Sequence, residues 1–308
     1  MIKEKHDCCG WSLRLQAYRY FAQNRILVDA PGQTCNRFWA YLDSIAWAMI
    51  KKKKVIIWFW DPSIKYYDRL RNNPYVVFPF YKPFFFKCLG EENIKKIVGK
   101  ILYNRPLREW LYKTHIAKNL GFYQSWELRK SHKYYPKVKE ELRCIYRPNE
   151  NICLEVENSI FPYKKKGYFL IGVHIRRGDY AEFEEGKYFF EFEEYRNVMF
   201  QLKSVYCDRK VVFFISTNEK YDKEIFEGLE ICDINNTSVA HDLYTLSLCD
   251  RIIGPLSTFS RWASWYGDVP LAFIERGQTT LSDKSFSVIS DFYHFMNGDE
   301  IPNLTDKF

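Results

Sequence analysis

The chain has 308 residues, of which 47% are hydrophobic and 27% charged, and it carries a net charge of +8. This length suits one large domain or two ordinary ones, and the hydrophobic content allows a sizeable core, so the composition excludes a disordered chain. The basic charge favours an acidic partner, such as a phosphorylated substrate, a nucleic acid or an anionic membrane face.

Nine cysteines are scattered along the chain without a C-x-x-C pair. Their odd number and spacing argue against a disulfide framework or a zinc site and favour a reducing compartment. The first ten residues contain charges and no apolar run, so we do not expect a signal peptide there. The longest apolar stretches, such as residues 55–60, are too short to span a bilayer. We therefore expect a soluble, cytoplasmic protein.

In the first half of the chain, short apolar runs alternate with amphipathic stretches. The pattern predicts, in chain order, a strand at 25–29, a helix at 36–50, a strand at 55–59, an aromatic loop at 78–86, and helices at 91–102, 106–118 and 135–144. The aromatic run is interpreted as a loop because it contains two prolines and has no clear period.

The lysine-rich segment 164–167 is expected to link two domains, residues 1–163 and 164–308. After it, the pattern predicts strands at 168–175, 210–216, 229–234, 251–254 and 271–275, with helices at 191–206, 219–227, 242–249 and 257–266. Repeated βα units of this kind predict an α/β fold with a parallel, doubly wound sheet, which binds ligands at the carboxyl ends of its strands.

The most informative motif follows the strand at 168–175, where residues 174–180 are His-Ile-Arg-Arg-Gly-Asp-Tyr. Arg176 and Arg177 leave the strand at the end where a nucleotide is expected to bind. A guanidinium group binds phosphate bidentately and keeps its charge, so it can stabilise a diphosphate leaving group. No Asp-x-Asp motif is present to hold a magnesium ion for that purpose. A surface ion-pair cluster is the alternative interpretation, and the complete motif makes it the weaker one.

A second segment, residues 241–265, contains a Gly-Pro turn followed by Ser257, Thr258 and Ser260 near the start of a predicted helix. Hydroxyl groups and backbone N–H groups at a helix N-terminus can bind an anion, although plain helix capping also explains them.

A third segment, residues 30–38, joins a predicted strand to a predicted helix through a glycine turn. It lacks the glycines of a dinucleotide-binding fingerprint or a Walker loop, so taken alone it is a weak sign of phosphate binding.

Together, residues 174–180 (HIRRGDY), residues 242–265 and the Gly32-x-x-x-Asn36-Arg37 segment resemble the α-1,2-fucosyltransferases. More broadly, they resemble the superfamily that includes the α-1,6- and protein O-fucosyltransferases. The resemblance implies two Rossmann-like domains in the GT-B arrangement, with the nucleotide-sugar site in the C-terminal domain and no metal cofactor. It also implies an inverting transfer of L-fucose from GDP-fucose to a glycan hydroxyl, with galactose O2 and an α-1,2 linkage expected.

The resemblance further assigns roles to single residues. Arg176 is expected to contact the donor β-phosphate, with Arg177 supporting the same region. His174 and Asp242 are expected to contact guanine, because a carboxylate can accept its N1–H and N2–H groups together. The remaining expected donor-binding residues are Ser257, Thr258, Ser260, Gly32, Asn36 and Arg37.

The sequence departs from the family pattern at two places. Many relatives have asparagine where this chain has Leu256, and an acidic pair is common at the position of Thr217 and Asn218. Both departures concern particular donor contacts and leave the class of protein unchanged.

An inverting transfer needs a general base to take the proton of the acceptor hydroxyl. Asp179 is the first candidate because it lies in the arginine motif, and Glu184 is the second because the α-1,6 relatives carry a catalytic glutamate at that spacing. Glu182 and Glu185 belong to the same acidic stretch, so a solvated loop carboxylate is an alternative for each of these acids.

Three other functions fit parts of the pattern. The chain could be a transferase of the same fold that uses another GDP-sugar or linkage, an inactive nucleotide-sugar-binding module, or a basic protein that binds nucleic acid through its aromatic residues. No nucleic-acid-binding motif is present, so no such partner is expected. A cytoplasmic enzyme of this kind is expected to modify a lipid-linked glycan, and its positive charge suggests peripheral contact with the inner membrane face.

Overall fold

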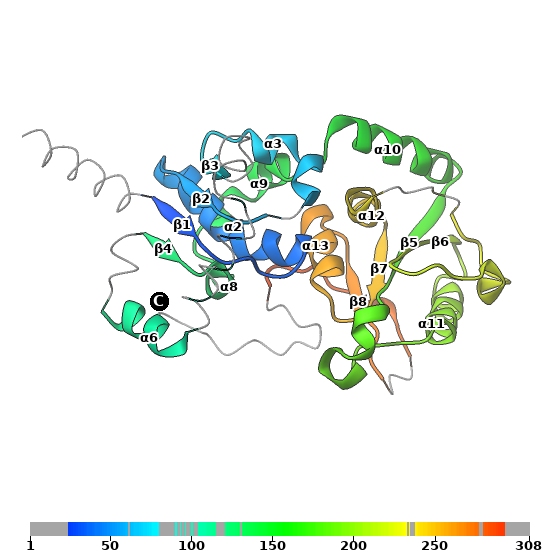
Figure 1. Cartoon of the computed structure of the whole chain (residues 1–308). Coiled ribbons are helices and arrows are strands. Elements are labelled where there is room, and N and C mark those ends of the chain that lie inside the picture. The colour runs from blue at the N-terminus through cyan, green and yellow to red at the C-terminus, as the bar shows by residue number, and fades with distance from the viewer. Residues whose placement is uncertain are drawn as a thin grey trace, which may run out of the picture. The chain divides into compact units, whose positions relative to one another are not determined.

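The computed structural model describes residues 24–60, 62–79, 90, 93, 96, 100, 104–114, 121–129, 131–232, 234, 238–276 and 280–292 (Figure 1). The first ten residues and most of the expected segments at 78–86 and 91–102 lie outside them. The chain divides into two compact units, which meet in sequence at Arg147 and Pro148. Among the described residues, no helix combines the length and apolar character that crossing a bilayer requires.

The first unit contains a parallel sheet whose described strands lie in the order β3-β2-β1-β4. Its elements are, in chain order, β1 Arg25–Leu27, α2 Thr34–Lys51, β2 Val55–Ile57, η1 Pro62–Tyr66, α3 Asp68–Arg71, β3 Val76–Val77, α6 Arg105–Lys113, β4 Phe122–Tyr123, α8 Ser125–Leu128, η3 Tyr135–Val138 and α9 Lys139–Ile145. The predicted strands at 25–29 and 55–59 and the helix between them are confirmed. The two-residue strands β3 and β4 were not predicted, because runs so short carry no period.

Helix α2 forms because its apolar residues recur every three or four positions. Phe38, Leu42 and Ile45 on this helix are fully buried. The Phe38 ring meets the rings of Tyr67 and Tyr146 edge to face, with centroids 5.1 Å and 4.9 Å away. Burying a side chain of this size contributes about 1.5–3 kcal/mol, so these contacts hold α2 in the core of the first unit.

The order of the first sheet reverses between β1 and β4, which are neighbours although β2 and β3 lie between them in sequence. Asp29 follows β1 at this point. Its carboxylate accepts hydrogen bonds from the backbone N and the Oγ of Ser125, both at 2.7 Å, and from the backbone N of Trp126 at 2.9 Å. The N–H groups at the start of α8 are thereby satisfied by the protein's own carboxylate.

The second unit contains a parallel sheet in the order β6-β5-β7-β8. Its elements are, in chain order, α10 Glu150–Lys165, β5 Tyr168–Ile175, η4 Gly178–Ala181, η5 Phe183–Gly186, α11 Phe192–Val205, β6 Lys210–Thr217, η6 Lys223–Phe226, α12 Val239–Leu246, β7 Arg251–Gly254, α13 Thr258–Gly267, β8 Leu271–Phe273 and η7 Asp283–Ser285. The predicted α/β class with a parallel sheet is confirmed.

Three details of the second unit differ from the sequence-based expectation. Lys164 and Lys165 belong to the last turn of α10, so the first half of the segment expected to be a linker is helical, and Lys166 and Gly167 form the turn that leads to β5. Helix α10 packs against α12 and continues through Pro162, a residue that helix propensity disfavours. The expected helix at 219–227 is reduced to the short η6, and the strand at 229–234 to one bridge between Phe213 and Ile231.

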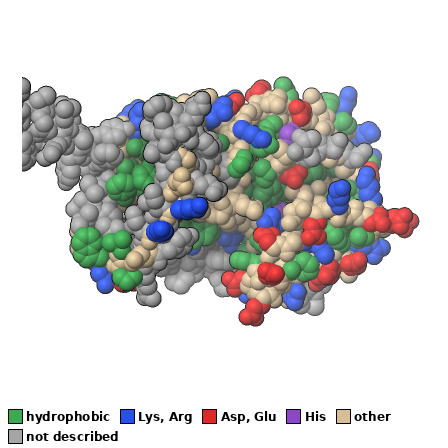
Figure 2. Space-filling view, in the orientation of Figure 1, with side chains coloured by type: hydrophobic (Ala, Val, Ile, Leu, Met, Phe, Trp, Pro, Cys, Tyr) green, Lys and Arg blue, Asp and Glu red, His purple; other side chains and the backbone are tan. Residues whose placement is uncertain are grey.

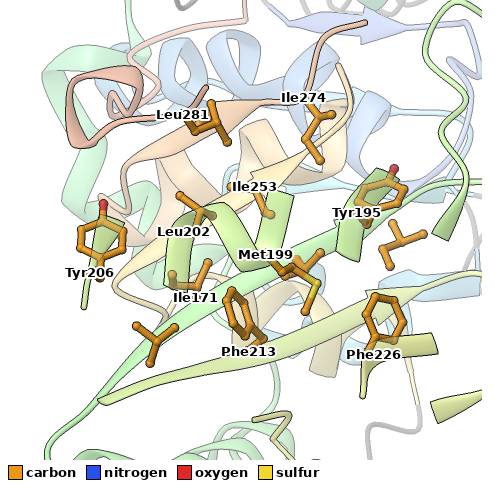
Figure 3. Packing of buried hydrophobic residues seen from close by; sticks show 14 of the residues in the cluster. Ile171, Tyr195, Met199, Leu202, Tyr206, Phe213, Phe226, Ile253, Ile274 and Leu281 are labelled. Atoms are coloured by element: carbon orange, nitrogen blue, oxygen red, sulfur yellow. The ribbon is translucent and has the colours of Figure 1, made fainter. Parts of the chain in front are cut away.

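Strand β5 is buried on both faces, which is typical of a central strand in a doubly wound sheet. Ile171, Val173 and Ile175 face helix α11 and pack with Met199 and Leu202 in the main core of this unit (Figure 3). The alternate residues of β5 face the other side of the sheet, which α12 covers (Figure 1). Residues that are two apart in the strand therefore share a face, and His174 lies on the face of α12.

Candidate functional site

The predicted site lies where the order of the second sheet reverses. Strands β6 and β7 lie on opposite sides of β5, so the chain leaves β5 toward one side and later returns to the other. Doubly wound sheets bind ligands in the crevice at such a switch point, outside the carboxyl ends of the strands. Residues 176–180 follow β5 and residues 255–257 follow β7 at this edge, so the first two motifs meet there.

His174 is buried at the end of β5, with 5% of its surface exposed. Its ring lies against the ring of Phe259, with centroids 4.9 Å apart. Its Nδ1 atom has no hydrogen-bond partner among the described residues. A Cβ atom added to Gly254 would lie 2.9 Å from the His174 carbonyl oxygen and 3.5 Å from Nδ1. The glycine therefore allows β7 to lie close to His174, whose Nδ1 can form a hydrogen bond with a ligand.

Burial makes this histidine neutral under ordinary conditions. It lowers the pKa of His174 from 6.5 to about 3, and the positive charge of Arg176 lowers the pKa in the same direction. A neutral imidazole can donate one hydrogen bond and accept another, so His174 can contact a nucleotide base without adding charge.

Arg176 lies just beyond β5 and pairs with Asp179, with Nη2 and Oδ2 2.8 Å apart. Its guanidinium also lies over the Tyr180 ring, 5.6 Å from the ring centre. The first base candidate is thus the direct partner of the residue expected to bind phosphate. A phosphate that binds Arg176 must compete with Asp179 for the same guanidinium.

Arg177 is held on several sides by the protein itself. Its Nη1 lies 2.5 Å from Glu191 Oε2 and its Nε lies 3.0 Å from Glu219 Oε2. The rings of Phe189 and Phe192 lie 4.7 Å and 4.5 Å from its guanidinium. Burial lowers the pKa of Arg177, but the hydrogen bonds and charges of the two glutamates outweigh burial and raise it. These contacts hold the Arg177 side chain in place, and its part in donor binding stays a prediction.

The departure at residues 217 and 218 has a structural explanation. Asn218 Oδ1 accepts a hydrogen bond from the Arg177 backbone N at 3.0 Å, and its Nδ2 donates to the Arg177 carbonyl oxygen at 3.3 Å. The acidic group of this segment is Glu219, one residue further along. Its pairing with Arg177 was missed because 42 residues separate the two in sequence.

Asp242 lies in the first turn of α12 and is joined to the sheet edge through Ser216. The Ser216 hydroxyl donates to Asp242 Oδ2 at 3.1 Å. Ser216 is the register partner of His174 on the neighbouring strand, so both side chains face the same side of the sheet. The two residues expected to contact guanine therefore lie on the same face at the same edge.

A polar network that sequence reasoning missed fixes the start of α12. His241 is buried, and its Nδ1 lies 2.7 Å from Ser238 Oγ while its Nε2 lies 3.0 Å from Glu155 Oε2 on α10. Ser238 also accepts a hydrogen bond from the His241 backbone N as the helix cap. The network positions the turn that carries Asp242, and only the pairing of α10 with α12 reveals it.

The hydroxyl groups after β7 have different positions. Ser257 caps α13 by accepting a hydrogen bond from the Phe259 backbone N at 3.2 Å, and Thr258 is the first residue of the helix. Ser260 is fully buried and donates to the Ser257 carbonyl oxygen at 3.3 Å. Ser257 and Thr258 therefore lie at the helix N-terminus, whereas the Ser260 hydroxyl is used inside the protein.

Tyr180 connects the two motifs, although sequence reasoning did not include it in the site. Its hydroxyl donates to the carbonyl oxygen of Leu256 at 3.2 Å. Burial raises the pKa of Tyr180, against a hydrogen bond with Ser257 that lowers it. The tyrosine was visible as the last residue of the first motif, but its bond to a residue 76 positions later was not.

Glu184, the second base candidate, lies in η5 and is exposed. It belongs to the loop between β5 and α11 that also carries Asp179. Both base candidates are therefore on one loop, next to the arginine motif.

The third motif lies in the first unit. Gly32 has a φ of +45°, a backbone conformation that other residues rarely adopt, and its Cα lies close to the Asn36 side chain. Arg37 is buried and its Nε donates to the Gly32 carbonyl oxygen at 3.1 Å. These contacts give Gly32 and Arg37 a structural role in their own loop, and their part in donor binding stays a prediction.

Within the described residues, no group of three or more His, Cys, Asp or Glu side chains is placed to hold a metal ion.

A parallel α/β sheet with an arginine motif and a helix N-terminus at its switch point is typical of proteins that bind phosphorylated ligands such as nucleotides. The family model for glycosyl transferase family 11 matches residues 92–284. This match covers more than half of the chain, which therefore belongs to glycosyl transferase family 11. A comparison with curated protein sequences gives no match.

Solved structures with a similar fold include three fucosyltransferases of low sequence identity. POFUT1 in complex with GDP-fucose is 11% identical, with a TM-score of 0.52 over 82% of this chain and 98% of that one. Fucosyltransferase NodZ from Bradyrhizobium is 15% identical, with a TM-score of 0.55 over 83% and 95%. A mutant of Arabidopsis thaliana FUT1 in complex with GDP is 10% identical, with a TM-score of 0.55 over 90% and 78%. At these identities the likeness shows the fold alone.

Proposed function

We propose that this chain is an inverting fucosyltransferase that transfers L-fucose from GDP-fucose to galactose O2 of a glycan, forming an α-1,2 linkage. The observation that carries the proposal is the position of Arg176 at the switch point of the second sheet, beside a buried histidine whose Nδ1 has no partner among the described residues. Membership of glycosyl transferase family 11 supports sugar transfer. The similar fold of a protein solved with GDP-fucose supports the donor.

In this proposal the two units form a GT-B arrangement, and the donor binds at the carboxyl edge of the second sheet. Its diphosphate lies between Arg176 and the N-terminus of α13, where Ser257 and Thr258 begin the helix. Its guanine is bound by Asp242 and His174, which lie on one face of that edge. The selectivity for guanine follows because a carboxylate accepts two N–H bonds from guanine and adenine cannot offer that pair.

The chemical step joins the acceptor oxygen to C1 of fucose while the bond from C1 to the β-phosphate oxygen breaks. The acceptor proton passes to a carboxylate, and GDP leaves with the electron pair. We assign the base to Asp179, because a phosphate bound to Arg176 releases the Asp179 carboxylate from its 2.8 Å ion pair. We assign charge neutralisation on the leaving group to Arg176, whose guanidinium keeps its charge throughout. Glu184 is the second candidate for the base.

Donor choice and product linkage test this proposal. GDP release should be measured with GDP-fucose and with GDP-mannose across a panel of galactosides, and the linkage of the product should be determined by NMR. We expect release only with GDP-fucose and a product linked at galactose O2. Transfer from GDP-mannose alone would contradict the fucose donor, and a product linked elsewhere would contradict the α-1,2 linkage.

The assignment of the base is tested by two isosteric variants. Asp179→Asn should lower kcat by about 10²–10⁴-fold, the usual contribution of a general base, and Glu184→Gln should leave it nearly unchanged. The opposite result would transfer the role to Glu184. GDP binding serves as the control, and it should not weaken in either variant. Asp179→Asn should bind GDP at least as tightly as the wild type, because Asp179 competes with phosphate for Arg176.

We also propose that the protein acts at the inner membrane face, on a lipid-linked glycan. Leu107 and Trp110 on α6 are 39% and 54% exposed, and the helix carries three basic residues and one acidic residue. Figure 2 shows hydrophobic and basic side chains together over α6. Exposed Trp and Leu beside basic residues are typical of helices that bind anionic lipid surfaces.

Vesicle binding tests this membrane contact. The full chain should sediment with vesicles that contain anionic lipid, and Trp110→Ala should weaken the binding. Phe161→Ala is the matched control, because Phe161 is an exposed aromatic residue on a different helix, α10, with 61% of its surface accessible. Equal binding by the wild type and Trp110→Ala would remove α6 from the contact.

A further inference from the structure

Three aromatic rings lie close together on the loop between β5 and α11. Phe183 stacks on Tyr180 with ring centroids 5.3 Å apart and an angle of 30° between the planes. The centroids of the Phe183 and Tyr188 rings are 6.2 Å apart, and the angle between their planes is 33°. Phe183 is nevertheless 48% exposed. We call Tyr180, Phe183 and Tyr188 the aromatic shelf.

The aromatic shelf is joined to the proposed donor site at one end. Arg176 lies over the Tyr180 ring, and the Tyr180 hydroxyl is bonded to the segment before α13. Arg276, which follows β8, donates through Nη2 to the carbonyl oxygens of Gly186 and Phe189, at 3.3 Å and 3.1 Å. Bonds on both sides therefore fix the loop that presents Phe183.

The loop also contains three consecutive residues in the left-handed backbone region. Glu184, Glu185 and Gly186 have φ values of +49°, +57° and +73°. Side chains other than glycine rarely adopt such values, and residues held there gather at binding and active sites. The left-handed turn reverses the chain between Phe183 and Tyr188, which brings their rings together.

The loop that carries the aromatic shelf is also rich in carboxylates. Asp179, Glu182, Glu184 and Glu185 belong to the same loop and are exposed. Figure 2 shows acidic and hydrophobic side chains side by side in the part of the molecule where Figure 1 draws the helical turns before α11. An apolar surface rimmed by a few hydrogen-bond acceptors is the chemistry that binds a sugar ring, because the ring has an apolar C–H face and a rim of hydroxyl groups.

We propose that the aromatic shelf binds the acceptor, with a pyranose ring packed on the exposed part of Phe183 and its hydroxyls facing the loop carboxylates. The inference rests on the proposed function, and it names the acceptor site of that transferase. Both base candidates lie on this loop, and a base must lie within hydrogen-bond reach of the hydroxyl that it deprotonates. The acceptor must therefore contact this loop whichever carboxylate is the base.

Kinetics with four proteins test the aromatic shelf: wild type, Phe183→Ala, Phe183→Tyr and Phe161→Ala. Acceptor KM should be measured with a methyl galactoside at saturating GDP-fucose, and GDP affinity by calorimetry. We expect Phe183→Ala to raise the acceptor KM by about three- to tenfold, the usual value of one aromatic contact, with an unchanged Kd for GDP. Phe183→Tyr should retain the wild-type KM, and so should Phe161→Ala, which removes an exposed phenylalanine from α10.

Two results would overturn the assignment. One is an acceptor KM that does not change in Phe183→Ala. The other is a Kd for GDP that rises as much as the acceptor KM, because the ring would then stack on the donor base. Thermal unfolding of each variant confirms that the loop change leaves the fold intact. If the alanine variant unfolds, Phe183→Leu takes its place, because it removes the ring but keeps an apolar side chain, and the same rise in acceptor KM is expected.

A binding measurement separates failure of the aromatic shelf from failure of the proposed function. Saturation-transfer NMR with methyl galactoside detects sugar contact without turnover. If the wild type binds the galactoside but transfers nothing from GDP-fucose, the proposed function fails and the aromatic shelf stands when Phe183→Ala weakens the NMR signal. If the signal is the same in the wild type and Phe183→Ala, the aromatic shelf fails regardless of the donor.

Discussion

The two sheets of this protein reverse their strand order in the same way, but their switch points are occupied differently. In the first unit, Asp29 follows β1 and binds the free N–H groups at the start of α8. In the second unit, the segment after β5 carries arginines, and the helix N-terminus after β7 is capped by the Ser257 hydroxyl. At the first switch point, the carboxylate of Asp29 binds the helix N-terminus. At the second, arginines and a helix N-terminus favour the binding of an anionic ligand.

This difference explains why one sheet edge is a candidate anion-binding site and the other is not. A carboxylate that accepts three hydrogen bonds satisfies the polar groups around it and leaves them unavailable to a ligand. Arg176 has a carboxylate partner too, but Asp179 is exposed and comes from a short turn three residues later. An exposed ion pair contributes at most about 1 kcal/mol, so a diphosphate can displace it.

The largest expected effect comes from removing the cation of the second switch point. Arg176→Ala should lower kcat for sugar transfer by about 10²–10³-fold, because one charge-stabilising donor at the leaving group is lost. The unfolding free energy should change little, since the side chain is near the surface. Steady-state kinetics and denaturant unfolding of the same protein sample measure both quantities.

Two other arginines provide controls for that variant. Arg196→Ala removes the same charge from α11, where the guanidinium lies 4.8 Å over Phe200, and should leave kcat unchanged. Arg177→Ala should lower the unfolding free energy by about 1 kcal/mol through its lost ring contacts, and lower kcat less than Arg176→Ala does. A larger loss of kcat in Arg177→Ala would exchange the roles of the two motif arginines.

A smaller effect is expected from adding a side chain at Gly254, where the end of β7 lies next to the end of β5. Gly254→Ala places a Cβ atom 2.9 Å from the His174 carbonyl oxygen, so the two strands must separate. We expect a loss of about 1–3 kcal/mol in stability, the usual cost of overpacking, together with weaker binding of GDP. Calorimetric titration with GDP measures the second effect. Unchanged GDP affinity in a folded Gly254→Ala protein would mean that the donor does not bind next to Gly254.

The buried histidine predicts a pH dependence of stability. Above pH 6.5, His174 is neutral in both the folded and unfolded states and has no effect. Between about 6.5 and 3, the unfolded chain binds a proton that the folded chain does not, because burial lowers the folded-state pKa to about 3. Stability should fall with falling pH in this window by up to about 1.4 kcal/mol per pH unit.

Comparing the wild type with His174→Asn isolates this contribution. The variant should show a shallower loss of unfolding free energy between pH 6 and 4, measured by urea unfolding at each pH. Identical slopes in the two proteins would mean that His174 takes up a proton in the folded state.

The smallest effect is expected at the first switch point. Asp29→Ala leaves the N–H groups of Ser125 and Trp126 without their carboxylate and should cost about 1 kcal/mol, the usual value of a helix cap. Affinity for GDP should not change, because the carboxylate serves structure in that unit. Weaker GDP binding with unchanged stability would contradict the contrast between the two edges.

The strands that form the site were predictable from sequence, and most of the contacts within it were not. Residues 168–175 and 251–254 form strands with the predicted bounds, because continuous β-branched and apolar runs leave few alternatives. The arginine motif was visible because it directly follows such a run.

The missed contacts join residues that are distant in sequence. Glu191 and Glu219 hold Arg177 from positions 14 and 42 residues later, and Tyr180 bonds to Leu256 across 76 residues. Such pairs depend on the order of strands in the sheet, which a single sequence does not specify. Helix α10 was missed because of a local feature. Pro162 predicts the end of a helix, whereas α10 continues through it in its tertiary context.

The pairing of β5 has a consequence for how such proteins diversify. Strand β5 is hydrogen-bonded to β6 and β7 on its two sides. A substitution that shifts the end of β5 therefore disturbs the pairing of all three strands. The loop that carries Phe183 lies beyond the last paired residue, so its length and sequence can vary without disturbing the sheet. We therefore expect related chains to use the same activated sugar even when their sequences have diverged widely. The molecules that receive the sugar should differ more readily from one relative to another.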